Sequence, residues 1–208
     1  MRLLIALALT GLQPQPAQMD ADPARQFAHE YLSPELWVEM ADKNIPTLID
    51  NCVAAKRIPA SRAAKATERY RAYVTDVGDG LKAIEPQVAD LFRAQFSPVE
   101  MSEVSGFFGT SAGRQAIKLT IAGLAARMTS AAACGVDQPA PDFEKMAAEN
   151  MAAMSDEDRA RFRTFALSPA GVKFRQVFPA TTPQVGVILQ PLVQAAAKRS
   201  GIAEVFND

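Results

Sequence analysis

Residues 97–113 read Ser-Pro-Val-Glu-Met-Ser-Glu-Val-Ser-Gly-Phe-Phe-Gly-Thr-Ser-Ala-Gly, and residues 155–171 read Ser-Asp-Glu-Asp-Arg-Ala-Arg-Phe-Arg-Thr-Phe-Ala-Leu-Ser-Pro-Ala-Gly. The two stretches align without a gap when position 155 is placed on position 97, and this offset of 58 is kept throughout. Such a repeat predicts two copies of one structural unit. The matched pairs are Ser97 with Ser155, Glu100 with Asp158, Val104 with Phe162, Phe107 with Phe165, Thr110 with Ser168, and Ala112-Gly113 with Ala170-Gly171.

Each copy is predicted to begin with a capped helix. Ser97 and Ser155 have the short polar side chain that favours a helix N-cap. Glu100 and Asp158 follow three residues later, where an acidic side chain closes a capping box. The short helix then presents two apolar side chains on one face at i, i+3, which are Val104 with Phe107 and Phe162 with Phe165.

A tight corner and a second helix are predicted to follow in each copy. Thr110 and Ser168 are suited to cap the second helix, and Pro169 occupies its first position in the second copy. Gly113 and Gly171 then fall at the third helical position. Because glycine lacks a side chain, the two helices of the corner are expected to approach each other closely there.

Helical spacing continues through the rest of the chain, and no stretch is typical of a strand. From Tyr70 to Leu91 apolar residues recur at alternating spacings of four and three, an a/d seam for which we expect a partner helix within the chain. The sequence therefore predicts an all-α fold, a helical bundle with a duplicated helix-corner-helix unit. We expect one helical domain over 18–208, with the first repeat at 97–134 and the second at 155–199.

Prolines and glycines mark the expected interruptions. Pro46 predicts a break or kink near Asn44–Ile45, because proline lacks the amide donor and clashes with the preceding turn. The Gly135–Pro141 stretch predicts a loop between the two copies. Pro179 and Pro183 predict an interruption after the second corner, with a new apolar helix beyond it.

The first copy also resembles a known family. Phe-Ser-x-x-Glu-Met at 96–101, followed by Phe-Phe-x-Thr-Ser-Ala-Gly at 107–113, is similar to the core motif of domain of unknown function family 2059. An aromatic residue, a Ser-Glu helix start, a Phe-Tyr pair and a Ser-Pro-x-Gly corner recur in that family. A degenerate second copy of the motif lies at 154–171, and Phe-Ala-Leu-Ser-Pro-Ala-Gly-Val-Lys at 165–173 keeps the corner better than the first copy does.

Three positions depart from the family pattern. Phe108 stands for the usual Tyr and Ser111 for the usual Pro in the first copy, while Ala166 replaces the second aromatic residue in the second copy. The resemblance implies a bacterial, exported, all-helical domain without an assigned activity. It transfers no catalytic residue, because the shared positions are helix caps and core residues.

The first residues have the order of a secretory signal peptide. Arg2 is followed by the apolar run Leu3–Leu9 and then by a polar, proline-containing stretch. The run is too short to span a bilayer as a stable helix. We expect 1–17 to be a signal peptide cleaved near Ala17 or Ala21, which places the mature protein in the periplasm or outside the cell. An ordinary buried N-terminal helix is the alternative.

Cys52 and Cys134 are the only cysteines in the chain. In an oxidising compartment they can form one intramolecular disulfide, which would close a loop of 82 positions. The alternative is a pair of buried thiols that behave as small apolar residues. Their spacing is not that of a Cys-x-x-Cys pair, so disulfide-exchange catalysis is not expected.

Composition and motifs give no support for an enzyme. The formal net charge is −1, so a nucleic acid is not expected as the main partner. His29 is the only histidine, and the sequence contains no nucleophile elbow, zinc-protease, P-loop or dinucleotide motif. We therefore expect no catalytic residue, no metal site and no cofactor, and no integral membrane segment after removal of the signal peptide.

These observations leave three functional hypotheses. The first is a non-catalytic protein that acts through contacts with an unknown protein partner in the cell envelope. The alternative is a periplasmic protein that binds a small molecule or lipid in a pocket between apolar helices. A hydrolase with a dispersed acidic site is the least favoured. The oligomeric state cannot be inferred from the sequence.

Overall fold

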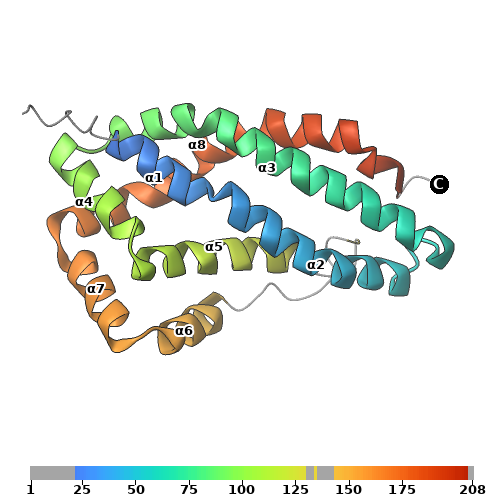
Figure 1. Ribbon diagram of the computed structural model, residues 1–208, viewed down its shortest axis with the longest axis horizontal. Helices are drawn as coiled ribbons and strands as arrows, with labels where there is room; N and C mark the ends of the chain where they lie inside the picture. The colour runs from blue at the N-terminus through green and yellow to red at the C-terminus, as the bar shows by residue number, and fades with distance from the viewer. Residues whose placement is uncertain (1–21, 130–133, 135–142, 206–208) are drawn as a thin grey trace, which may run out of the picture.

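The computed structural model describes residues 22–129, 134 and 143–205, and in these residues all regular structure is helical (Figure 1). The fold prediction of an all-α helical bundle is therefore confirmed. The predicted signal peptide and the Gly135–Pro141 loop lie outside the described residues. The helices are α1 (Pro23–Leu32), α2 (Pro34–Ala54), α3 (Ala63–Arg93), α4 (Pro98–Phe108), α5 (Ser111–Thr129), α6 (Phe143–Ala153), α7 (Asp156–Leu167) and α8 (Pro169–Ser200), with 3-10 turns η1 (Ala60–Arg62) and η3 (Ile202–Val205).

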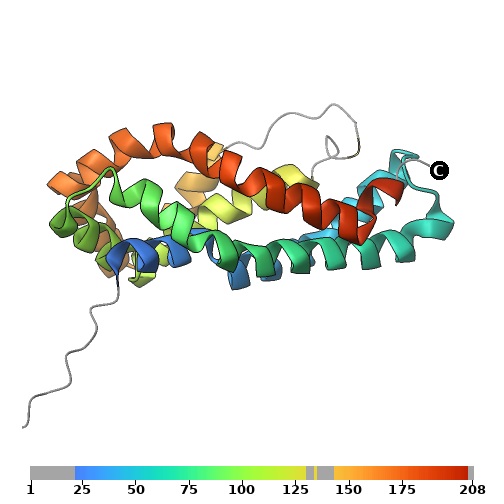
Figure 2. The ribbon, with the colours of Figure 1, turned by 90° about the horizontal axis from the view of Figure 1, so that it is seen from above.

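Helix α3 is the centre of the bundle. It contacts α1 and α2 on one side and α8 on the other, and it runs antiparallel to both long helices (Figures 1 and 2). The apolar seam from Tyr70 to Leu91 faces these neighbours, and all of its members are buried except the partly buried Leu91. The seam thus finds its partners within the chain, as its spacing predicts.

The internal prolines do not interrupt the helices, so the predicted breaks are wrong. Helix α2 continues through Pro46, and α8 continues through Pro179 and Pro183 as well as Pro191. All of these prolines lie on exposed faces. The carbonyl groups that lose their amide partners also belong to exposed residues, where water can form the missing hydrogen bond.

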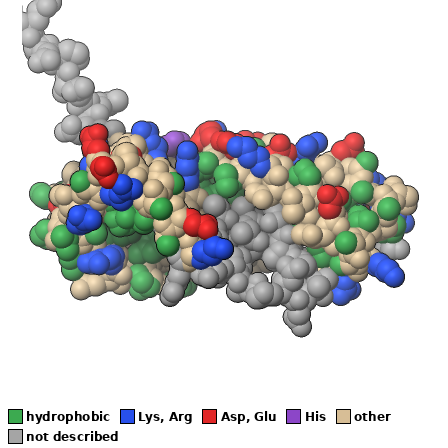
Figure 3. All heavy atoms as spheres, turned by 90° about the horizontal axis from the view of Figure 1, so that it is seen from below, with side chains coloured by type: hydrophobic (Ala, Val, Ile, Leu, Met, Phe, Trp, Pro, Cys, Tyr) green, Lys and Arg blue, Asp and Glu red, His purple; other side chains and the backbone are tan. Residues whose placement is uncertain are grey.

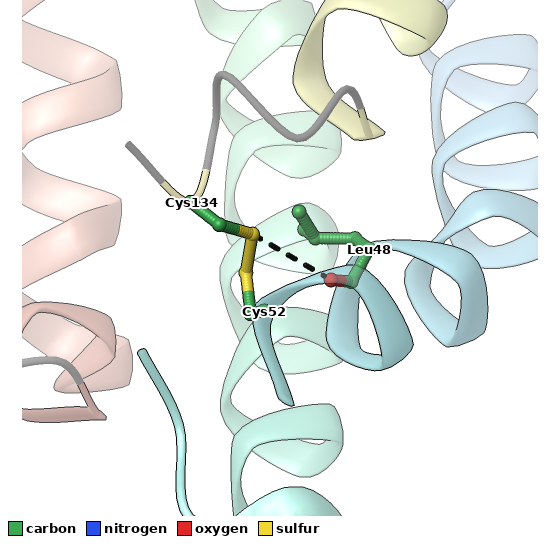
Figure 4. Close-up of a disulfide and its surroundings, with 3 residues drawn as sticks. All are labelled: Leu48, Cys52 and Cys134. Atoms are coloured by element: carbon green, nitrogen blue, oxygen red, sulfur yellow. Dashed lines mark hydrogen bonds between the residues drawn. A yellow bond between two sulfur atoms is a disulfide. The ribbon is translucent and has the colours of Figure 1, made fainter. Parts of the chain in front are cut away.

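A disulfide joins Cys52 at the end of α2 to Cys134 (Figure 4). The two Cα atoms are 5.1 Å apart, and the Sγ of Cys134 lies 3.8 Å from the carbonyl oxygen of Leu48. Both cysteines are buried in a small apolar cluster at one end of the bundle, with Ile45, Ile58 and residues of α3. The larger cluster occupies the opposite end, where α1, α4, α5 and α8 meet α3.

None of the helices within residues 22–129 and 143–205 combines the length with the hydrophobicity that a membrane span requires.

Candidate functional site

The first corner lies between α4 and α5. The Ser97 hydroxyl accepts a hydrogen bond from the amide of Glu100 at 3.3 Å, and the Glu100 carboxylate accepts one from the amide of Ser97 at 2.8 Å. These two bonds form a capping box. At the corner, the Thr110 hydroxyl accepts a hydrogen bond from the amide of Gly113 at 3.2 Å, which caps the start of α5.

The second corner lies between α7 and α8 and has nearly the same bonds. The Ser155 hydroxyl accepts from the amide of Asp158 at 3.0 Å, and the Ser168 hydroxyl accepts from the amide of Gly171 at 3.1 Å. The predicted capping box is not completed here. The Asp158 carboxylate instead accepts a hydrogen bond from the hydroxyl of Ser111 in the first corner, so it links the two corners.

Both corners need glycine at the third position of the second helix. A Cβ atom at Gly113 would overlap the backbone of Phe107 and Phe108, and one at Gly171 would overlap the carbonyl group of Phe165. Backbone atoms cannot rotate away as a side chain can. The close approach expected from the sequence is therefore present in both corners.

The two corners face each other around a pair of stacked rings. Phe107 and Phe165 occupy equivalent positions in the aligned stretches, and their rings are parallel within 3° with centroids 4.1 Å apart. Helix α4 contacts α8, and α7 contacts α5, so each short helix packs on the second helix of the other corner. Glu100 strengthens this arrangement, because its carboxylate accepts a hydrogen bond from the Nζ of Lys173 at 2.6 Å.

A cavity of about 290 Å³ lies beside this stack, and most of its wall is aromatic. Figure 3 shows hydrophobic side chains gathered on the lower face of the molecule at the end that carries α4 and α7. We call this space the aromatic cavity. Its rings are Tyr31, Phe107, Phe108, Phe162, Phe165, Phe174 and Phe178, and its other lining residues are Ala116, Ile117, Thr120, Ala166, Gly171 and Arg175.

A second apolar cavity, of about 390 Å³, adjoins the first. Tyr31 and Thr120 line both spaces, so the two cavities meet at these side chains. We call it the Trp37 cavity, after the only tryptophan of the chain. Its other lining residues come from α1, α3, α5 and α8 and are Leu32, Tyr73, Val77, Leu81, Ile121, Val185, Leu189 and Val193.

The polar groups of these cavities are few. Burial raises the pKa of the Tyr31 phenol, although a hydrogen bond with Thr182 acts in the opposite direction, and burial also raises the pKa of Tyr73. Both phenols therefore stay neutral at physiological pH. The indole N–H of Trp37 has no acceptor among the described residues. In the described part of the chain, Arg175 is the only charged residue that lines either cavity.

Sequence reasoning identifies only part of this site. Phe107, Phe165 and Gly171 belong to the predicted corners, but Tyr31 and Trp37 come from the first two helices, which no local pattern connects to the corners. One signal was available for α8, since Phe174 and Phe178 are spaced at i, i+4 directly after the second corner.

The residues considered for chemistry lie elsewhere. His29 is half exposed, and its Nδ1 is 2.8 Å from the Oε1 of Glu85, a hydrogen bond that raises the histidine pKa. Among the described residues, no group of three or more His, Cys, Asp or Glu side chains is arranged to hold a metal ion. No family model, curated protein or solved structure matches the chain.

Proposed function

We propose that this protein is an exported, non-catalytic binding protein that holds an apolar small molecule or lipid chain. The observation that carries the proposal is the pair of adjoining cavities beside the Phe107–Phe165 stack. Small-molecule sites are typically concave, largely apolar and about 300–1,000 Å³ in volume, with few polar groups. The two cavities taken together fall in this range, and their walls are aromatic and aliphatic.

The cavities change the order of the functional hypotheses. From the sequence, contacts with a protein partner come first, because helical seams without chemistry favour them. The long seam of α3 is covered within the chain, so it does not require a second protein. The apolar space inside the bundle instead supports the alternative of small-molecule or lipid binding. A role through protein contacts stays a prediction, as does the resemblance to family 2059.

Export is proposed on two grounds. The order of residues in 1–17 is that of a signal peptide. The Cys52–Cys134 disulfide is of the kind that persists in oxidising compartments such as the periplasm. A chain recovered from the bacterial cell with an intact N-terminus and two free thiols would contradict this part of the proposal.

The direct test is native mass spectrometry of the protein purified from the exported fraction of its host, without reductant or detergent. We expect a mass above that of one mature, disulfide-bonded chain, and an organic molecule that is released on denaturation. A chain without added mass that also fails to take up a neutral apolar dye would overturn the binding proposal.

A matched pair of variants locates the bound molecule. Ala166 lines the aromatic cavity at the position equivalent to Phe108, so the cavity lies where the second copy lacks a ring. Ala166→Phe fills this space and is expected to reduce dye binding at least tenfold while the helix content stays unchanged. Leu167→Phe is the control, because the Leu167 side chain is 73% exposed and does not line either cavity. Equal loss of binding in both variants would place the molecule elsewhere.

A further inference from the structure

Arg175 gives the aromatic cavity one polar edge. Its side chain lies on α8, one residue beyond the ring of Phe174, and its residue is exposed to solvent. The other described residues that line this cavity are uncharged, and so are those that line the adjoining Trp37 cavity. Among the described residues, the positive charge beside these two adjoining cavities is therefore confined to the aromatic cavity.

The guanidinium of Arg175 has no ion-pair partner among the described residues. No carboxylate in the described part of the chain forms an ion pair with it. Its neighbour Lys173 differs, because the Nζ of Lys173 is bound to Glu100 at 2.6 Å and lies over the ring of Phe96. A guanidinium that remains free beside an apolar cavity is suited to bind a carboxylate through two parallel hydrogen bonds.

We propose that the ligand is a fatty acid, a single unbranched chain with a carboxylate head that pairs with Arg175. This inference rests on the proposed function and adds the chemical class and orientation of the bound molecule. The chain lies against the rings of the aromatic cavity and passes Tyr31 and Thr120 into the Trp37 cavity. The volumes of about 290 and 390 Å³ leave room for one such chain, and its single negative charge complements a guanidinium that has no ion-pair partner among the described residues.

Trp37 allows the orientation to be measured in the unmodified protein. It is the only tryptophan, and it lines the cavity that receives the end of the chain. Dodecanoic acid brominated at its terminal carbon brings the heavy atom close to the indole and is expected to quench its fluorescence strongly. The same acid brominated at the α-carbon holds the bromine near Arg175 and is expected to quench weakly. Stronger quenching by the second acid would place the head beside the free indole N–H and overturn the assignment to Arg175.

The charge is tested with unlabelled ligands that differ only in the head. Dodecanoic acid is expected to bind roughly three- to fivefold more tightly than 1-dodecanol, because an exposed guanidinium contributes modestly to an ion pair in water. Arg175→Gln is expected to abolish this difference while the alcohol binds as before. Arg163→Gln is the matched control, since Arg163 is an exposed arginine of α7 that does not line either cavity.

The outcomes separate this inference from the function on which it rests. If acid and alcohol bind equally and Arg175→Gln changes neither, the fatty-acid assignment fails but the apolar binding site stands. If neither ligand binds and neither bromo acid quenches Trp37, the proposed function fails as well. Equal loss of acid binding in the Arg175 and Arg163 variants would indicate general electrostatic attraction and overturn the specific pairing.

Discussion

The two corners share the cap hydrogen bonds of their Ser and Thr hydroxyls but differ in how deeply they are buried. In the first, α4 contributes five buried residues to the core, including Phe107 and Phe108. In the second, none of the residues of α7 is fully buried, although Phe162 and Phe165 pack against the core from its edge. The cap bonds of Ser97 and Ser155 are present all the same. Capping is thus fixed by a few adjacent residues, whereas burial depends on the rest of the chain.

The difference also explains where the cavity lies. At equivalent positions the first corner has Phe108, whose ring is buried in the core and also lines the aromatic cavity, and the second has Ala166, whose small side chain leaves space in the same cavity. The acidic residues differ as well, because Glu100 closes its own cap while Asp158 bonds to Ser111. The first corner is therefore a rigid part of the core, and the second forms a wall that leaves space beside it.

The largest effect is expected from the disulfide, whose loop encloses the first corner and excludes the second. Reduction, or the double variant Cys52→Ala/Cys134→Ala, is expected to lower the free energy of unfolding by about 4.5 kcal/mol. The loop spans 82 positions, and its closure restricts the unfolded chain. Urea denaturation with and without reductant measures the loss. A change below about 1 kcal/mol in both experiments would show that the bond contributes little.

The glycines allow the two corners to be compared directly. Gly113→Ala and Gly171→Ala both force a Cβ atom onto a backbone carbonyl of the preceding helix. The overlap is at least as severe at Gly171, so the difference depends on which helix can move. We expect a loss of about 3 kcal/mol at Gly113, because α4 is held in the core, and about 1 kcal/mol at Gly171, because α7 can shift outward. Equal losses in urea denaturation would mean that α7 is held as firmly as α4.

The smallest effect concerns the acidic residue of the first cap. The hydrogen bond from Lys173, followed by those from Ser97, lowers the pKa of Glu100 from 4.5 to about 2. A carboxyl group with a lowered pKa stabilises the folded state above its unfolded pKa, and this contribution is lost as the pH falls from about 4.5 to about 2. Glu100→Gln should therefore have a lower urea midpoint than wild type at pH 7, and the two midpoints should converge near pH 2.

Glu103→Gln is the control for this titration. Glu103 lies on the exposed side of the same helix, outside the capping box. Its replacement is expected to leave the difference between neutral and acid midpoints nearly unchanged. A deficit of Glu100→Gln that persists in full at low pH would show that the lost hydrogen-bond geometry matters, and not the charge.

The features that sequence reasoning predicts are those that adjacent residues determine. Thr110 and Ser168 form their bonds to an amide three residues ahead, and Gly113 and Gly171 avoid a clash with the helix just before them. The seam of α3 is also predictable, because the apolar residues on the buried face of a long helix recur at regular spacings. In these cases the interacting groups are close in the sequence or periodic within it.

The remaining features depend on distant contacts. Tyr31 reaches both cavities only because α1 packs against α3 and α4, and no spacing in the sequence indicates this. The breaks predicted at Pro46 and Pro183 failed for a different reason, since the effect of a proline depends on the face that it occupies. For Pro46 the apolar pattern does indicate an exposed position. Ile45, Leu48 and Ile49 form the buried face of α2, and Pro46 lies on the opposite, solvent side.

The prolines give the walls of the Trp37 cavity different mechanical properties. The α3 wall contains Pro86 as its only internal proline, whereas the α8 wall contains Pro179, Pro183 and Pro191. Each proline removes one backbone hydrogen bond on the exposed side of its helix, and a helix with fewer of these bonds bends more easily. Of the helices that line the Trp37 cavity, α8 is therefore expected to bend more readily than α3, so that the cavity widens or narrows mainly by movement of α8.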